Sequence, residues 1–194
     1  HCQLGRVSPE DYDKVAEIAV PEIVTADCVD EIERETRHDI MALTKAMAEA
    51  AGDSGWCIHL GATSNDIVDS AVALQIRDSI LLQQITIKKL LATMCDLAER
   101  ERDTVMLGRT HGQAAVPITF GLKIAVWVDE FRRHLDRLDE LTPRVTTGKF
   151  LGAVGTGAAQ GENAFELQNL IMNNLGLQTP IATTQVVGRD RYIE

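Results

Sequence analysis

Hydrophobic side chains recur at helical spacing along most of the chain. The stretch from Thr63 to Leu107 contains neither Gly nor Pro, and its apolar residues lie three or four positions apart. Thr63, Ser64 and Asp66 supply hydroxyls and an acid typical of a helix start. We therefore predict one helix from about Ser64 to Arg102, roughly 55–60 Å long at about 1.5 Å per residue. A helix of this length needs packing partners along all of it.

Two further long helices are predicted on either side of this one. The first covers residues 27–50 and ends at Gly52, and the second begins at Pro117 and ends at Leu141, before Thr142-Pro143. Shorter helices are expected at 9–19, at 162–175 and from about residue 184. Aromatic residues make up only 4% of the chain and alternating strand patterns are rare, so the predicted fold class is all-α, a bundle of long helices.

A glycine-rich stretch, residues 148–157, superficially resembles a phosphate-binding loop. No strand is predicted before it, and Lys149 does not stand in the G-K-[ST] order of a P-loop. Close packing of the backbone at a bend is the better interpretation.

Composition excludes several classes of function. The chain has 194 residues and a formal net charge of −10, which argues against a general nucleic-acid or anionic-membrane binder. No apolar run is long enough for a membrane span, and no signal-peptide pattern opens the sequence. The four cysteines are widely spaced and form no zinc motif, so we expect reduced thiols in a cytoplasmic protein.

Three histidines lie in polar segments that each have an ordinary and a functional interpretation. His38, between Arg37 and Asp39, fits a solvated helix face pointing away from the apolar stripe. His59 precedes the long helix, whose N-terminus is a natural site for an anion, although simple capping explains the nearby hydroxyls. His111 lies between Gly108 and Gly112 in the loop that joins the two longest helices, where a catalytic group or a core histidine is equally plausible.

Taken together, these segments resemble the adenylosuccinate lyase family of the fumarase/aspartase superfamily. The G-x-T-S-x-D and G-R-T patterns are shared across the superfamily, whereas T-R-H-D and His111 narrow the resemblance. Related 3-carboxymuconate cycloisomerases usually carry Trp at this position, and argininosuccinate lyases and fumarases lack T-R-H-D. The segments are T-R-H-D (36–39), H-L-G-A-T-S-N-D (59–66), G-R-T-H-G-Q with P-I-T-F-G (108–121), G-A-V-G-T (152–156) and T-T-Q-V-V-G-R-D-R (183–191).

The resemblance implies a β-elimination that releases fumarate. Adenylosuccinate would give AMP, and SAICAR would give AICAR, both in purine nucleotide biosynthesis. The reaction needs a base, an acid and fixed donors around the developing negative charge. No metal or organic cofactor and no nucleic-acid or membrane partner is implied. The family's active sites are shared between subunits of a homotetramer.

The resemblance also assigns roles to residues. His111 matches the general acid, and its near-neutral reference pKa suits proton donation. His38 matches an assisting residue, and Thr63 and Ser64 match the groups that bind the succinyl carboxylate. The implied substrate-binding residues are Arg37, His38, Asp39, His59, Thr63, Ser64 and Gln185.

One expected part of the family's machinery is absent from these 194 residues. The general base of the family is a serine in an S-S-x-M-P-x-K-x-N loop, and no such pattern occurs here. We therefore interpret the chain as an interior fragment and expect it to be inactive alone. Residues 1–80 would complete an N-terminal helical domain and residues 81–194 would begin the central bundle, with the C-terminal domain missing. Another superfamily lyase or cycloisomerase, or an inactive helical scaffold, remains an alternative.

Overall fold

The computed structural model describes residues 1–194 and divides them into two compact units. The first unit consists of His1–Val72 and Thr147–Arg189, and the second of Ala73–Thr146 and Asp190–Glu194. Helices dominate both units, which confirms the predicted fold class. No helix is long and apolar enough to cross a membrane. The boundary expected near residue 80, between the N-terminal domain of the family and its central bundle, stays a prediction.

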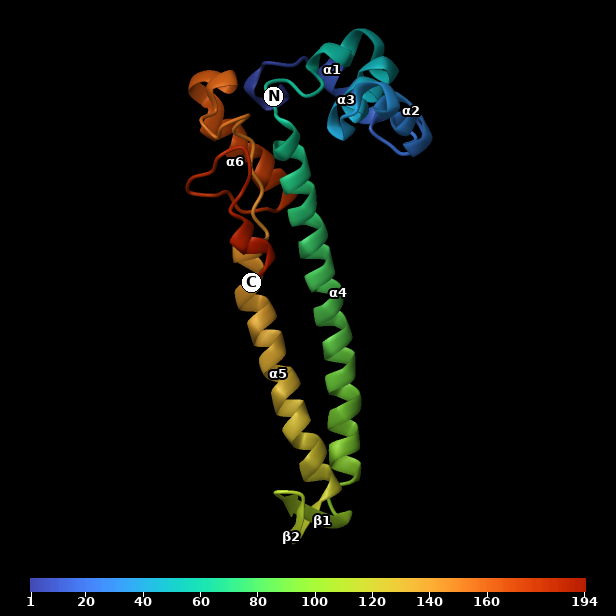
Figure 1. Cartoon of the computed structure of the whole chain (residues 1–194), viewed down its shortest axis with the longest axis vertical. Helices are drawn as coiled ribbons and strands as arrows, with labels where there is room; N and C mark the ends of the chain where they lie inside the picture. Colours follow the sequence, from blue (N-terminus) through green and yellow to red (C-terminus); the bar gives the residue numbers. More distant parts are fainter. The chain divides into compact units, whose positions relative to one another are not determined.

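The first unit opens with three short helices, α1 (Pro9–Ile18), α2 (Ala26–Thr36) and α3 (Asp39–Ala51) (Figure 1). The prediction of one helix over 27–50 is wrong, because the backbone breaks at Arg37 and His38. Arg37 adopts a left-handed conformation with φ of 52°, and the His38 side chain caps α3 by accepting the Met41 N–H. Polar side chains that bond to nearby backbone groups compete with the helix ladder in this way.

The second segment of this unit contains a 3₁₀ helix, η3 (Ala158–Asn163), followed by α6 (Ala164–Leu175). Leu167, Met172 and Val187 are fully buried here. The glycine-rich stretch packs closely, as interpreted from the sequence: a Cβ on Gly148 would lie 2.6 Å from the Met172 sulfur.

The prediction of a helix from about residue 184 is wrong. The Asp69 carboxylate accepts the Val187 N–H at 2.8 Å, and only a short 3₁₀ helix, η4 (Arg189–Tyr192), follows.

A buried ion pair joins the two segments of the first unit. Asp66, in the first turn of α4 (Ser64–Arg100), and Lys149 are both fully buried, and the Lys149 ammonium donates to Asp66 Oδ1. The same carboxylate accepts the N–H groups of Thr63 (2.9 Å), Leu151 (3.1 Å) and Gly152 (3.0 Å). One side chain thus caps α4 and anchors the glycine-rich stretch to it.

Two antiparallel helices form the body of the second unit. The part of α4 from Ala73 onward lies beside α5 (Phe120–Val145) (Figure 1), and Gln84 Nε2 donates to Asp139 Oδ1 at 2.6 Å. The predicted extent of α4 is confirmed to within two residues. At 37 residues it measures about 55 Å.

A β-hairpin connects α4 and α5 and was missed by the sequence pattern. Strands β1 (Val105–Thr110) and β2 (Gln113–Thr119) pair antiparallel, with His111 and Gly112 as a two-residue turn. Both turn residues have positive φ, 52° and 72°, which is the type I′ geometry suited to the twist of a hairpin. The predicted start of the following helix is therefore wrong, because Pro117 lies in β2.

The ends of α5 follow from its caps rather than from its prolines. The Thr119 hydroxyl accepts the Leu122 N–H at 3.1 Å and fixes the start of the helix at Phe120. Pro143 does not stop the helix, contrary to the prediction. It lies close to the C-terminal end, where its missing N–H removes only one bond of the ladder, and α5 continues to Val145.

Breaking the Asp66–Lys149 pair is expected to destabilise the first unit. Lys149→Met leaves a buried carboxylate without its countercharge, and removing one partner of a buried pair costs about 3 kcal/mol or more. The free energy of unfolding, measured by urea titration, should fall by this amount. Lys45→Met is the matched control, because Lys45 is exposed and pairs weakly with Glu49 at 3.9 Å. Adding Asp66→Asn to Lys149→Met should restore part of the loss, and equal stability of Lys149→Met and Lys45→Met would contradict the prediction.

Candidate functional site

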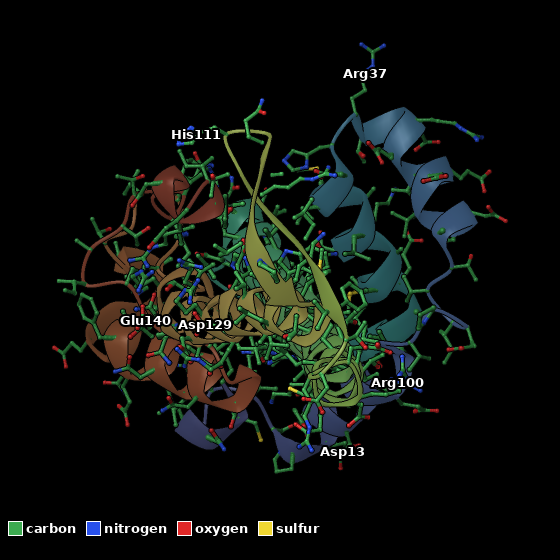
Figure 2. The ribbon with its side chains drawn as sticks, turned by 90° about the horizontal axis from the view of Figure 1, so that it is seen from below. Asp13, Arg37, Arg100, His111, Asp129 and Glu140 are labelled. Carbon is green, nitrogen blue, oxygen red and sulfur yellow. The ribbon has the colours of Figure 1, made fainter.

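The junction between α2 and α3 carries the first group of predicted site residues. Arg37 is exposed, and Figure 2 shows its side chain projecting away from the ribbon. Asp39 uses one carboxylate oxygen to accept the Ile40 N–H at 2.7 Å. His38 is the N-cap of α3 rather than a residue on a continuous helix face, which corrects the orientation expected from the helical pattern.

The His38 ring links two segments that are 26 residues apart in sequence. Its Nδ1 accepts the Met41 N–H at 3.3 Å, so in this state Nδ1 is unprotonated and the ring hydrogen is on Nε2. Nε2 lies 3.3 Å from the Ser64 hydroxyl and donates to it. The Asp39 Oδ1 also lies 3.2 Å from Nδ1. The ring is therefore held at Nδ1 and presents Nε2 beside the start of α4.

The loop before α4 carries the second group, and its backbone is unusual. His59 has a φ of 62°, and its carbonyl accepts the Ala62 N–H at 3.1 Å. His59 Nδ1 is buried without a hydrogen-bond partner. Burial lowers the pKa of His59, a change that the Asp66 carboxylate opposes and the His38 ring reinforces. The loop thus holds a neutral imidazole with an unsatisfied nitrogen.

The start of α4 fits an anion-binding role. The Asp66 carboxylate accepts the Thr63 N–H, which is the bond from the third helical side chain back to the residue before the helix in a capping box. The Ser64 hydroxyl faces His38. N–H groups at a helix N-terminus attract anions through the helix dipole. The charge of Asp66 is countered by Lys149, so it does not stand alone against an incoming anion.

The remaining predicted residues, Gln185 and His111, are both exposed. Gln185 is exposed in the segment that Asp69 ties to α4 through Val187 and Arg189, but it touches neither His38 nor Ser64. His111 belongs to the second unit, where it is exposed at the tip of the hairpin without a hydrogen bond inside the chain (Figure 2). Its imidazole is accessible, as a general acid must be.

All three non-glycine residues with positive φ are among the predicted site residues. They are Arg37, His59 and His111. Such conformations cost roughly 1 kcal/mol or more for a residue with a Cβ, and they cluster where function requires them. This backbone signal is absent from the amino-acid sequence and supports the choice of these residues independently.

Three supporting residues were not singled out from the sequence. Asp69, Lys149 and Gln160 are nearly fully buried and bond to the backbone around the start of α4. A lysine inside an otherwise apolar, glycine-rich stretch was the available signal, because a buried ammonium requires a partner. No group of three or more His, Cys, Asp or Glu residues is arranged to hold a metal ion.

The pKa of His59 predicts a pH dependence of stability. Because the pKa is lowered in the folded state, the unfolded chain binds the proton more readily. The contribution of His59 to the free energy of unfolding is therefore fully present above pH 6.5, the ordinary pKa of histidine. It is lost as the pH falls below this value. In His59→Asn, which keeps a residue tolerant of positive φ, the unfolding midpoint should fall less between about pH 7.5 and pH 5.5 than in the unsubstituted chain. Parallel curves for the two proteins would contradict the prediction.

Comparisons with known proteins match the chain to lyases. The profile of a lyase family, Lyase_1, matches residues 13–194. Adenylosuccinate lyase of Pyrococcus abyssi is 46% identical over the whole chain, which covers 43% of that protein. N-acetyl-S-(2-succino)cysteine lyase of Enterococcus italicus is 38% identical over 99% of the chain and 42% of its own length.

A solved structure of a related enzyme has the same fold as this chain. The 3-carboxy-cis,cis-muconate lactonizing enzyme of Pseudomonas putida superposes with a TM-score of 0.90 and 29% identity, over 99% of this chain and 44% of that enzyme. The chain thus spans less than half the length of the relatives it matches. Its sequence, its fold and the shared segments lead to one conclusion: the chain belongs to the Lyase_1 family of lyases, in the fumarase/aspartase superfamily.

Proposed function

We propose that this chain is the part of an adenylosuccinate lyase that binds the succinyl group and supplies the general acid. The enzyme would eliminate fumarate from adenylosuccinate to give AMP, and from SAICAR to give AICAR, in cytoplasmic purine nucleotide biosynthesis. The named relatives support the reaction, and the residues around His38 support the site.

The observation that carries the proposal is the contact between His38 and Ser64. It joins T-R-H-D, the segment that distinguishes this family from argininosuccinate lyases and fumarases, to the G-x-T-S-x-D segment of the whole superfamily. Capping of α3 accounts for one nitrogen of the His38 ring, whereas the second nitrogen beside the Ser64 hydroxyl is not needed for that cap.

The start of α4 is proposed to bind a succinyl carboxylate. Thr63 and Ser64 would donate hydrogen bonds from their hydroxyls, and the dipole of α4 favours the negative charge. His38 and His59 would offer imidazole nitrogens, and Arg37 and Gln185 would add contacts from their exposed side chains. Asp39 has a supporting role, because its carboxylate holds the start of α3.

The chemistry follows from the substrate. A base removes the proton from the carbon next to one carboxylate, and the electrons collect on that carboxylate. They then form the double bond of fumarate as the bond between carbon and the purine nitrogen breaks. His111 is proposed to protonate that nitrogen. The base is the serine of a loop that these 194 residues do not contain.

Assembly with further copies is part of the proposal. His38 and Ser64 belong to the first unit and His111 to the second. The long helices expose large apolar side chains, among them Leu81, Leu82 and Trp127, which a partner helix would cover. We propose a homotetramer in which neighbouring copies share residues of one active site.

Elimination from a sulfur atom is the second candidate. It is favoured by the relative named for cleavage of N-acetyl-S-(2-succino)cysteine, which is 38% identical. Both reactions release fumarate from a succinyl group, so the same carboxylate site serves both. They differ in the leaving group, a purine nitrogen or a cysteine sulfur.

The first experiment compares the chain alone with a completed protein. The completed protein is this chain extended by the parts of the Pyrococcus abyssi enzyme outside the matched region. We expect fumarate release from adenylosuccinate by the completed protein and none by the chain alone, because the serine loop is missing. Absorbance at the fumarate band measures both.

A panel of substrates separates the candidates. Faster turnover of N-acetyl-S-(2-succino)cysteine, argininosuccinate or the 3-carboxymuconate compounds than of adenylosuccinate would replace the proposed substrate. Robust turnover by the chain alone would refute the expected role of the missing serine loop.

The second experiment tests His111 as the acid. His111→Asn in the completed protein keeps a residue suited to the positive φ of the hairpin turn but cannot donate a proton as an acid. We expect kcat to fall about 10²–10⁴-fold with the oligomeric state unchanged. His134→Asn, at an exposed position on α5, is the control and should retain full activity. Unchanged kcat in His111→Asn would remove His111 from its proposed role.

A further inference from the structure

Gln160, a residue with no assigned role, contacts the loop before α4 from another segment of the chain. This side chain is almost fully buried in η3. Its Nε2 donates to the Leu60 carbonyl at 3.0 Å, and its Oε1 accepts from Arg6 at 3.0 Å. Arg6 also donates to the Gln160 backbone carbonyl at 2.6 Å. Both ends of the amide are satisfied, so its orientation is fixed.

The Gln160 amide occupies the space that a side chain at Gly61 would need. A Cβ on Gly61 would lie 2.3 Å from Gln160 Nε2, and its φ is +66°. A side chain at this position is therefore excluded both by the neighbouring amide and by the backbone conformation. The Gln160 amide lies directly against the backbone of the candidate substrate loop.

Holding the Leu60 carbonyl also fixes the next N–H group. The Leu60–Gly61 peptide is trans and planar, so the Gly61 N–H points away from the side on which the Leu60 carbonyl is held. This N–H has no acceptor within the chain, whereas those of Ala62 and Thr63 are bonded to His59 and Asp66. Gly61 thus offers one unused donor two residues after His59, whose Nδ1 is also unsatisfied.

We propose that Gln160, anchored by Arg6, is a positioning residue that fixes the Gly61 N–H as a donor to a carboxylate of the substrate. The identity of that carboxylate as a succinyl group rests on the proposed function. The bond from Gln160 does not touch the substrate. It sets the orientation of the Leu60–Gly61 peptide, whose N–H would contact the substrate. Gln160 therefore acts on substrate binding rather than on proton transfer.

Gln160→Met tests this role in the completed protein. Methionine keeps the length of the side chain but cannot donate to Leu60. Loss of one fixed donor in the bound state should raise KM for adenylosuccinate about tenfold, with kcat within about twofold of the unsubstituted value. A purely structural residue would lower the amount of active enzyme without moving KM.

Gln168→Met is the matched control. Gln168 is equally buried in the same unit and also bonds to a backbone group, accepting the Phe150 N–H at 3.0 Å, but it does not contact residues 59–64. We expect comparable loss of thermal stability in the two variants and a rise in KM only in Gln160→Met. A rise of the same size in Gln168→Met would overturn the inference.

Amide hydrogen exchange in the 194-residue chain gives a readout that does not depend on activity. Exchange over residues 59–64 should be faster in Gln160→Met than in Gln168→Met. Unchanged exchange, or faster exchange with unchanged KM, would overturn the inference. If the completed protein without substitutions does not cleave adenylosuccinate, the proposed function fails, and exchange alone decides whether Gln160 fixes the loop.

Discussion

The first unit depends on one buried carboxylate. Asp66 accepts hydrogen bonds from the backbone of its own helix start and of the glycine-rich stretch, and the Lys149 ammonium balances its charge. Burying two charges requires that they pair and that further hydrogen bonds satisfy their remaining polar atoms. Here Asp66 accepts three backbone N–H groups, and the Lys149 ammonium also donates to the Gly152 carbonyl at 3.3 Å. The consequence is geometric. Segments more than 80 residues apart in sequence are fixed to the same turn of α4, and the loop that precedes this turn inherits that rigidity.

A site for an anion beside a buried carboxylate requires this neutralisation. Without Lys149, the charge of Asp66 would oppose the dipole of α4 and repel a carboxylate ligand. With it, the helix end keeps its positive character, and Ser64 and the free Gly61 N–H provide directional donors. His38 and His59 add imidazoles at the same place, of which His59 is kept neutral by burial. The proposed binding thus relies on dipoles and neutral donors more than on a cluster of basic side chains, which suits a chain with a net charge of −10.

Helical periodicity predicted the longest element well, because α4 has no Gly or Pro to interrupt it. The prediction failed where local polar contacts override periodicity. His38 ends one helix and caps the next, although its neighbours have good helical spacing, and the tip of the hairpin is a two-residue turn with a histidine where glycine or asparagine is usual. The candidate residues came from motifs, whereas the partners of the residues that hold them came only from coordinates. Lys149 and Gln160 bond to partners 83 and 100 positions away, distances at which no sequence pattern is visible.

The three positive-φ residues carry an evolutionary consequence. At Arg37, His59 and His111 the backbone alone would favour glycine or asparagine, which adopt this conformation at lower cost. Selection for folding therefore pushes these positions toward the smaller residues, and only selection for the side chain holds them in place. A descendant released from its function would replace them early, long before its helices lost their hydrophobic faces. Retention of all three in a diverged sequence is thus a sensitive indicator that the function is still under selection.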